Sequence, residues 1–108
     1  MTVGFDAFAT HPTGGTGNLT FTPAGIGASI AGAVVKVYEL SATRGVTGVT
    51  YGGNAMTLLG EVSKASGEAG TVSAWGLFSS VPGGSQEIVV SVTGGDNRNA
   101  VVNTYTGG

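Results

Sequence analysis

Apolar and polar residues alternate along much of this chain, which is the pattern of β-strands with one buried face. Between residues 18 and 23, Leu19 and Phe21 alternate with threonines, and the same pattern recurs between residues 86 and 93. Residues 33–40 differ, because apolar side chains occupy both alternation sets there. That stretch is therefore predicted to be a central strand.

The same pattern, broken by glycine-rich turns, predicts about eight short strands. They are expected at residues 2–10, 18–23, 33–40, 46–51, 55–59, 71–78, 86–93 and 100–105. Residues 24–32 are predicted to form a loop or a single turn, because three glycines oppose a helix there. Residues 61–70 are expected to be an exposed connection. These elements predict an all-β fold, a single antiparallel β-sandwich of the Ig-like or jelly-roll kind that spans residues 1–108.

A tight hairpin turn is predicted at Gly52 and Gly53, which separate two β-prone runs. A two-residue type I′ turn needs positive φ at both central positions, and glycine adopts it without steric cost. Counting outward from the turn places Val49 and Tyr51 on one face of the first arm. In the second arm, Met56 and Leu58 should alternate with their neighbours.

Composition narrows the function classes. Glycine accounts for 21 of 108 residues, yet no Gly-X-Y period occurs, so collagen is excluded. Charged residues make up 9% and the formal net charge is −2, which argues against nucleic-acid binding and indicates a surface partly covered by neighbours. The four basic residues are scattered, at Lys36, Arg44, Lys64 and Arg98. Cysteine is absent, no apolar run has the length of a membrane span, and Asp6 stands where a signal peptide needs basic and then apolar residues.

Catalytic chemistry is not expected from these residues. His11 is the sole histidine, it lies in a Pro-Gly loop, and no Gly-x-Ser-x-Gly elbow accompanies it. The six acidic residues are assigned to loops and outward strand positions, so paired catalytic carboxylates are not predicted. We expect no enzyme activity and no cofactor.

Two groups of residues could form binding sites, one for calcium and one for sugars. Asp96, Asn97 and Asn99 offer oxygen ligands in the style of a weak calcium loop, but Arg98 lies among them, so an Asx turn is favoured and no metal site is predicted. An aromatic platform for sugars is the second candidate. Its members would be Trp75, Tyr51 and Tyr105, and burial of Trp75 and Tyr51 in the core is favoured.

Three segments carry a family resemblance: residues 46–57 (VTGVTYGGNAMT), 74–77 (AWGL) and 82–84 (PGG). Together they resemble glycine-rich β-sandwich modules of bacteriophage virion proteins and large bacterial surface proteins. Such modules run V-x-x-V-T-Y-G-G-x-x-L-T, then a Trp-containing strand, a P-x-G turn and a Val-rich strand. The match covers residues 33–108, and the first 32 residues match loosely.

The resemblance implies a non-enzymatic phage virion structural protein, a capsid decoration or stabilising protein bound to the outer shell. Its partner would be the major capsid protein or another virion protein, in a homo-oligomer or multi-copy lattice, without nucleic acid or membrane. It would be a small stand-alone protein or the ordered head of a longer one, made in the host cytoplasm without a signal peptide and located in the virion. The alternative is a carbohydrate-binding or adhesin module of a phage tail or bacterial surface.

The N-terminal segment is the predicted interface. Residues 2–10 contain no lysine to protect an edge strand, and residues 1–17 are therefore considered as an interface arm. Strict alternation would put Phe5 and Phe8 on opposite faces of that strand. The predicted contact residues are Phe5 or Phe8 of the strand and His11, Gly14 and Gly15 of the loop after it.

Overall fold

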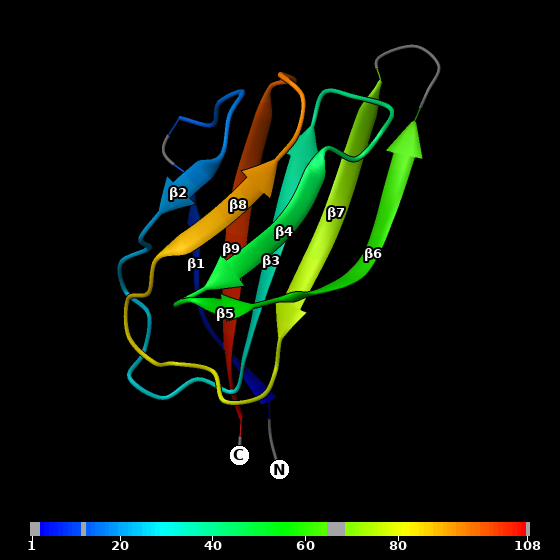
Figure 1. The fold of residues 1–108 in the computed structure, drawn as a ribbon. Helices are drawn as coiled ribbons and strands as arrows, with labels where there is room; N and C mark the ends of the chain where they lie inside the picture. Colours follow the sequence, from blue (N-terminus) through cyan, green and yellow to red (C-terminus); the bar gives the residue numbers. More distant parts are fainter. Residues whose placement is uncertain (1–2, 12, 65–68, 108) are drawn as a thin grey trace.

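The alternating segments form two antiparallel β-sheets that pack face to face, so the predicted all-β sandwich is confirmed (Figure 1). The computed structural model describes residues 3–11, 13–64 and 69–107. In those ranges no helix has the length and apolar character needed to cross a membrane.

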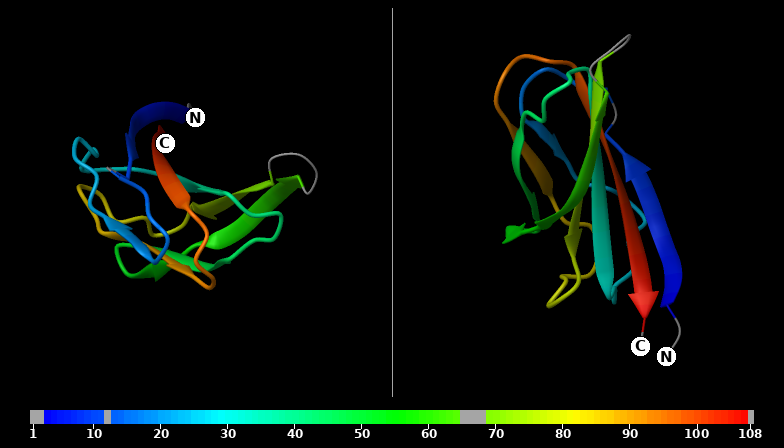
Figure 2. Two further views of the ribbon diagram at one scale, coloured as in Figure 1. Left: turned by 90° about the horizontal axis from the view of Figure 1, so that it is seen from above. Right: turned by 90° about the vertical axis from the view of Figure 1, so that its right-hand side faces the viewer.

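The described residues contain nine strands, one more than expected. They are β1 (Val3–Thr10), β2 (Leu19–Phe21), β3 (Gly32–Glu39), β4 (Val46–Tyr51), β5 (Asn54–Ala55), β6 (Thr57–Lys64), β7 (Gly70–Leu77), β8 (Ile88–Val92) and β9 (Arg98–Gly107). The five-stranded sheet has the order β1-β9-β3-β7-β6, and the four-stranded sheet has the order β2-β8-β4-β5. Figure 2 shows the two sheets as separate layers. The prediction that residues 33–40 form a central strand is confirmed, because β3 is the middle strand of the larger sheet.

The core lies between the sheets and is built by the predicted alternation. Val35 and Val37 of β3 face Val49 and Tyr51 of β4 across the sandwich, and all four side chains are buried. Trp75 of β7 is buried as well, and its indole Nε1–H donates to Ser73 Oγ at 3.1 Å. The expected inward position of Trp75 and Tyr51 is confirmed.

The glycine hairpin has the expected turn, but its second arm is shorter than expected. Gly52 and Gly53 have φ values of 56° and 83°, as the turn type requires. The arm pairs with β4 only through Asn54 and Ala55, and the chain then crosses at Met56 into the other sheet as β6. Met56 is buried and its N–H donates to the Val49 carbonyl. One buried side chain between the layers therefore replaces the continuous arm predicted for 55–59.

Two other expectations from the sequence are wrong. Residues 61–64 belong to β6 and pair with β7, instead of forming part of a connection; residues 65–68 lie outside the described ranges. Strict alternation fails in β1, where Phe5 pairs with Tyr105 and Ala7 with Thr104, so that Asp6 forms a β-bulge.

The bulge turns the Asp6 carboxylate inward, where its Oδ2 accepts hydrogen bonds from the Gly27 amide at 3.0 Å and the Thr104 hydroxyl at 2.8 Å. Phe5 and Phe8 consequently lie on the same face of the sheet, and both are exposed.

We predict that Gly52→Val and Gly53→Val each lower the free energy of unfolding by more than about 1 kcal/mol, because a β-branched residue is strained at positive φ. A Cβ at Gly52 would also lie 2.9 Å from Pro82 Cγ. Gly48→Val in β4 is the control, since a Cβ there meets no atom within 4 Å. Urea unfolding measures all three variants. Equal midpoints for the hairpin variants and the control would contradict the turn assignment.

Tyr51 predicts a pH dependence of stability. Burial raises the pKa of its phenol above the ordinary value of about 10, and the charge of Asp6 adds to the rise. The unfolded chain thus loses this proton first, so the free energy of unfolding should fall as the pH rises above about 10. Tyr51→Phe should flatten that fall. Parallel stability curves for the two proteins across this range would show that Tyr51 is not the cause.

Candidate interaction surface

The two outward faces of the sandwich differ in chemistry. On the four-stranded sheet, one row across the strands contains Thr20, Val89, Thr50 and Ala55. On the five-stranded sheet, large apolar side chains are exposed on or beside every strand except β9: Phe5, Phe8, Tyr38, Leu59, Val62, Val72 and Phe78. We call this second surface the outer face. Because a contiguous exposed apolar patch marks an interaction site, the outer face is the candidate surface.

Aromatic rings gather at the β1 side of the outer face. The Phe5 ring centroid lies 6.4 Å from that of Phe8 and 6.1 Å from that of Tyr105 in an edge-to-face arrangement. Phe8 is 66% exposed and Phe5 is 59% exposed, although both belong to an ordered strand. The two phenylalanines predicted as contact residues are thus brought together, by the bulge that the sequence pattern did not indicate.

A third phenylalanine, which the sequence did not single out, extends the aromatic group across the sheet. Phe78 follows β7, and its ring lies over Gly32 and Gly76. A Cβ on Gly32 would be 2.7 Å from the Phe78 ring, and a Cβ on Gly76 would be 2.5 Å from it. Glycine inside a strand often marks such a close approach, so the strand glycines were the sequence signal that could have indicated the position of the Phe78 ring.

The predicted loop residues lie elsewhere. Nδ1 of His11 accepts hydrogen bonds from the amides of Gly14 at 2.9 Å and Thr13 at 3.3 Å, and its ring packs edge-to-face on buried Phe21. Gly15 pairs with Arg98 in an isolated β-bridge. Gly14 has φ of 67°, and a Cβ there would lie 2.5 Å from the Arg98 carbonyl oxygen. This loop therefore contacts its own chain, and a role for it in an interface stays a prediction.

A buried ion pair holds that loop. Arg98 Nε lies 2.7 Å from Glu39 Oε2, and both side chains are fully buried between the layers. The expectation that all acids lie in loops or outward positions is thus wrong for Glu39. The guanidinium also donates to backbone carbonyls of two further chain segments, those of Thr16, Thr93 and Asp96. The same Glu39 oxygen accepts the Gly45 amide at 2.9 Å.

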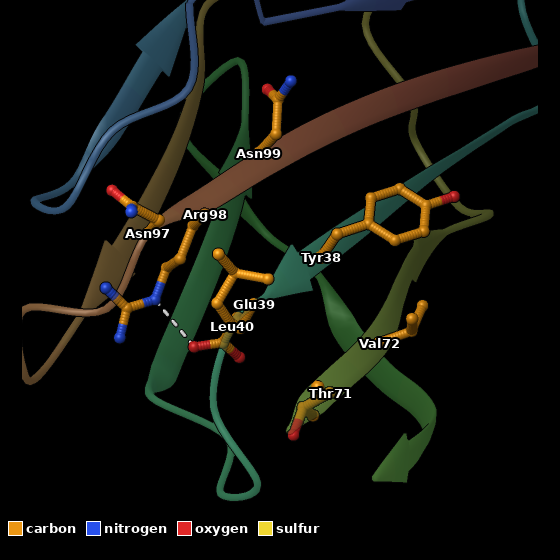
Figure 3. Close-up of a pocket in the computed structure, with 9 residues that line it drawn as sticks. Tyr38, Glu39, Leu40, Thr71, Val72, Asn97, Arg98 and Asn99 are labelled. Carbon is orange, nitrogen blue, oxygen red and sulfur yellow. Dashed lines mark hydrogen bonds and ion pairs between the residues drawn. The ribbon is translucent and has the colours of Figure 1, made fainter. Parts of the chain in front are cut away.

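A hollow of about 440 Å³ opens beside this pair, between the ends of β3, β7 and β9 (Figure 3). Tyr38, Leu40 and Val72 form part of its lining, and Glu39 turns its carboxylate toward the Arg98 guanidinium. Glu39 Oε1 is buried and has no hydrogen-bond partner within the described part of the chain. The two charged groups at this hollow, Glu39 and Arg98, form an ion pair with each other, which suits a structural role better than acid–base chemistry.

The candidate calcium loop is organised by the same arginine. The Asp96 backbone carbonyl accepts from the Arg98 guanidinium at 2.9 Å, so a cationic side chain already contacts this loop. Across the described ranges, no group of three or more His, Cys, Asp or Glu residues is arranged to hold a metal ion. The candidate sugar platform is divided, since Trp75 and Tyr51 are in the core and Tyr105 lies on the outer face with Phe5.

No family model and no curated protein matches this chain. Among solved structures, the chain is similar to the C-terminal CBM6 of LamC, a marine laminarinase from Zobellia galactanivorans. The identity is 17%, the alignment covers 83% of this chain and 74% of that chain, and the TM-score is 0.38. Similarity at this level is too weak to transfer a fold or a function.

The two arginine–glutamate pairs predict very different mutational costs. Arg98→Met leaves Glu39 buried without its partner and should lower the free energy of unfolding by about 3–5 kcal/mol. Arg44→Met is the matched control, because Arg44 pairs with Glu61 at 3.8 Å with both side chains partly exposed, and such pairs contribute about 0–1 kcal/mol. Chemical denaturation compares the two variants. Equal losses would show that the buried pair does not anchor the fold.

Proposed function

We propose that this protein is a non-enzymatic structural component of a bacteriophage virion, and that it decorates the capsid shell by packing the outer face against a shell protein. The observation that carries the proposal is the contrast between the two outward faces. The outer face exposes phenylalanine, valine and leucine, whereas the row across the opposite sheet consists of two threonines, one valine and one alanine. The family resemblance of residues 33–108 supplies the virion context.

The polar groups of the chain support a structural role. The buried Glu39–Arg98 pair is engaged in joining strands and loops, and the His11 ring nitrogen Nδ1 accepts backbone amides. Asp6 accepts hydrogen bonds from Gly27 and Thr104. Each of these groups, which would be the obvious acids and bases of an enzyme, makes contacts that hold the fold.

A carbohydrate-binding module is the competing function, because exposed rings can stack on sugars. Sugar sites combine such rings with polar groups that are positioned to fix the ligand's orientation. Here the ring cluster consists of Phe5, Phe8 and Tyr105, and only the tyrosine carries a hydrogen-bonding atom. A protein surface, which needs apolar contact area and shape complementarity, fits this group better.

We predict that the double variant Phe5→Ser, Phe8→Ser loses binding to capsid shells. Burial of one aromatic ring contributes about 1.5–3 kcal/mol, so removal of two should weaken binding by about two orders of magnitude or more. The probe is an assembled shell of the proposed partner, a bacteriophage major capsid protein, and co-sedimentation with imaging measures occupancy. Point replacement is preferable to deletion of β1, because Ala7 and Ala9 pack on the core.

The control is Val89→Ser, which removes an apolar side chain from the opposite outward face. This variant should bind shells like the parent protein. Equal shell binding by the folded double variant and the control would place the contact away from the outer face. Binding of the parent protein to a glycan array, with loss in the double variant, would favour the carbohydrate function.

A further inference from the structure

A single lysine lies near the centre of the outer face, beside Asn99, Val101 and Asn103 of β9. Lys36 is on the middle strand β3, opposite Ala74 of β7 and Val101 of β9. Its side chain is exposed, and among the described residues no acid lies within ion-pair distance of it. Outward charges elsewhere on this sheet lie at its rim, such as Lys64 at the end of edge strand β6.

A hollow of about 530 Å³ adjoins this lysine. It forms because Gly60 and Ala74 contribute almost no side chain to the sheet, and Val62, Val72 and Tyr38 surround them. Glu61 also lines the hollow, but its carboxylate faces Arg44 at 3.8 Å. The surface beside Lys36 is therefore an apolar depression next to a cation that has no acid of its own among the described residues.

We propose that the outer face binds a protein surface of a different chain, apolar in character and with a carboxylate placed opposite Lys36, and that Lys36 prevents two copies of this chain from pairing through the same face. The proposal rests on the proposed function in one respect, since it specifies the chemistry of the shell contact.

The size of the outer face suits a protein partner. Five strands about 4.8 Å apart, each about eight residues long at about 3.3 Å per residue, give roughly 600 Å² per partner. An interface of about 1,200 Å² in total is at the lower end of the range for specific complexes. Area alone would therefore allow two copies to pair face to face, and the charge at the centre decides against it.

Two copies would bring their lysines together. Sheets that pack face to face keep their strands within about 30° of each other at a spacing of about 10 Å, so the middle strand of one copy would lie over that of the other. Both Lys36 ammonium groups would then lose water near each other without an anion, which is strongly unfavourable. A carboxylate in the same position converts this repulsion into a charge-assisted hydrogen bond.

The protein itself provides the probe. Sedimentation equilibrium compares the parent protein, Lys36→Met and the control Lys64→Met, which makes the same substitution at the rim of the same sheet. We expect the parent protein and Lys64→Met to be monomers, and Lys36→Met to self-associate at least about tenfold more tightly, the equivalent of about 1.4 kcal/mol.

A second experiment places a carboxylate opposite Lys36 by mixing the parent protein with a Lys36→Glu variant. Lys36→Glu, which alters an exposed position, should be monomeric alone and should form a one-to-one complex with the parent protein, weakened by added salt. Adding Phe8→Ser to both partners should abolish the complex.

Two results would overturn the proposal: a parent protein that dimerises until Phe8→Ser separates it, or a Lys36→Met variant and a Lys36→Glu mixture that both stay monomeric. If the Lys36→Met and Lys36→Glu experiments both give the expected result but the protein does not bind shells, the virion partner is rejected. The proposed role of Lys36 in partner selection would still stand.

Discussion

The fold depends on the ion pair between Glu39 and Arg98. This pair joins strands β3 and β9 of the five-stranded sheet to the loops at one end of the sandwich. Burying two charges is costly unless each is paired and hydrogen-bonded, so the surrounding backbone must supply acceptors and donors. Backbone carbonyls accept hydrogen bonds from the Arg98 guanidinium, and the Gly45 amide donates one to the Glu39 carboxylate. A Cβ at Gly45 would clash with the Arg98 guanidinium, so glycine is required there. One pair thus contacts three loop segments, at Thr16, at Gly45 and at Thr93 to Asp96.

This pair also explains the limit of prediction from sequence. Alternation correctly predicted the strands with one fully buried face, such as β2 and β8, and the central β3. Glu39 and Arg98 lie far apart in the chain and resemble ordinary surface charges; only the pairing of β3 with β9 places them opposite each other. Edge strand β6 was missed for a related reason, because both its faces are largely exposed and its residues need not alternate.

The outer face was predicted in part. Phe5 and Phe8 were predicted from the sequence as contact residues but were placed on opposite faces of the strand. They share a face because of a β-bulge, which the alternation of apolar and polar residues does not encode. Phe78 and the hollow near Lys36 depend on glycines within strands. The sequence pattern assigned no packing role to Gly32, Gly60 or Gly76, yet Gly32 and Gly76 make room for the Phe78 ring and Gly60 lines the hollow.

The distribution of charge connects stability to recognition. Among the described residues, two acid–base pairs form, Glu39 with Arg98 in the interior and Glu61 with Arg44 near the surface, and neither includes Lys36. An apolar sheet face without any charge would be attractive to every similar face, including its own copies. One central cation makes that attraction selective, because its cost disappears only where the partner provides an anion. Under this proposal, Lys36 therefore both disfavours pairing between copies and determines which charge a partner must supply.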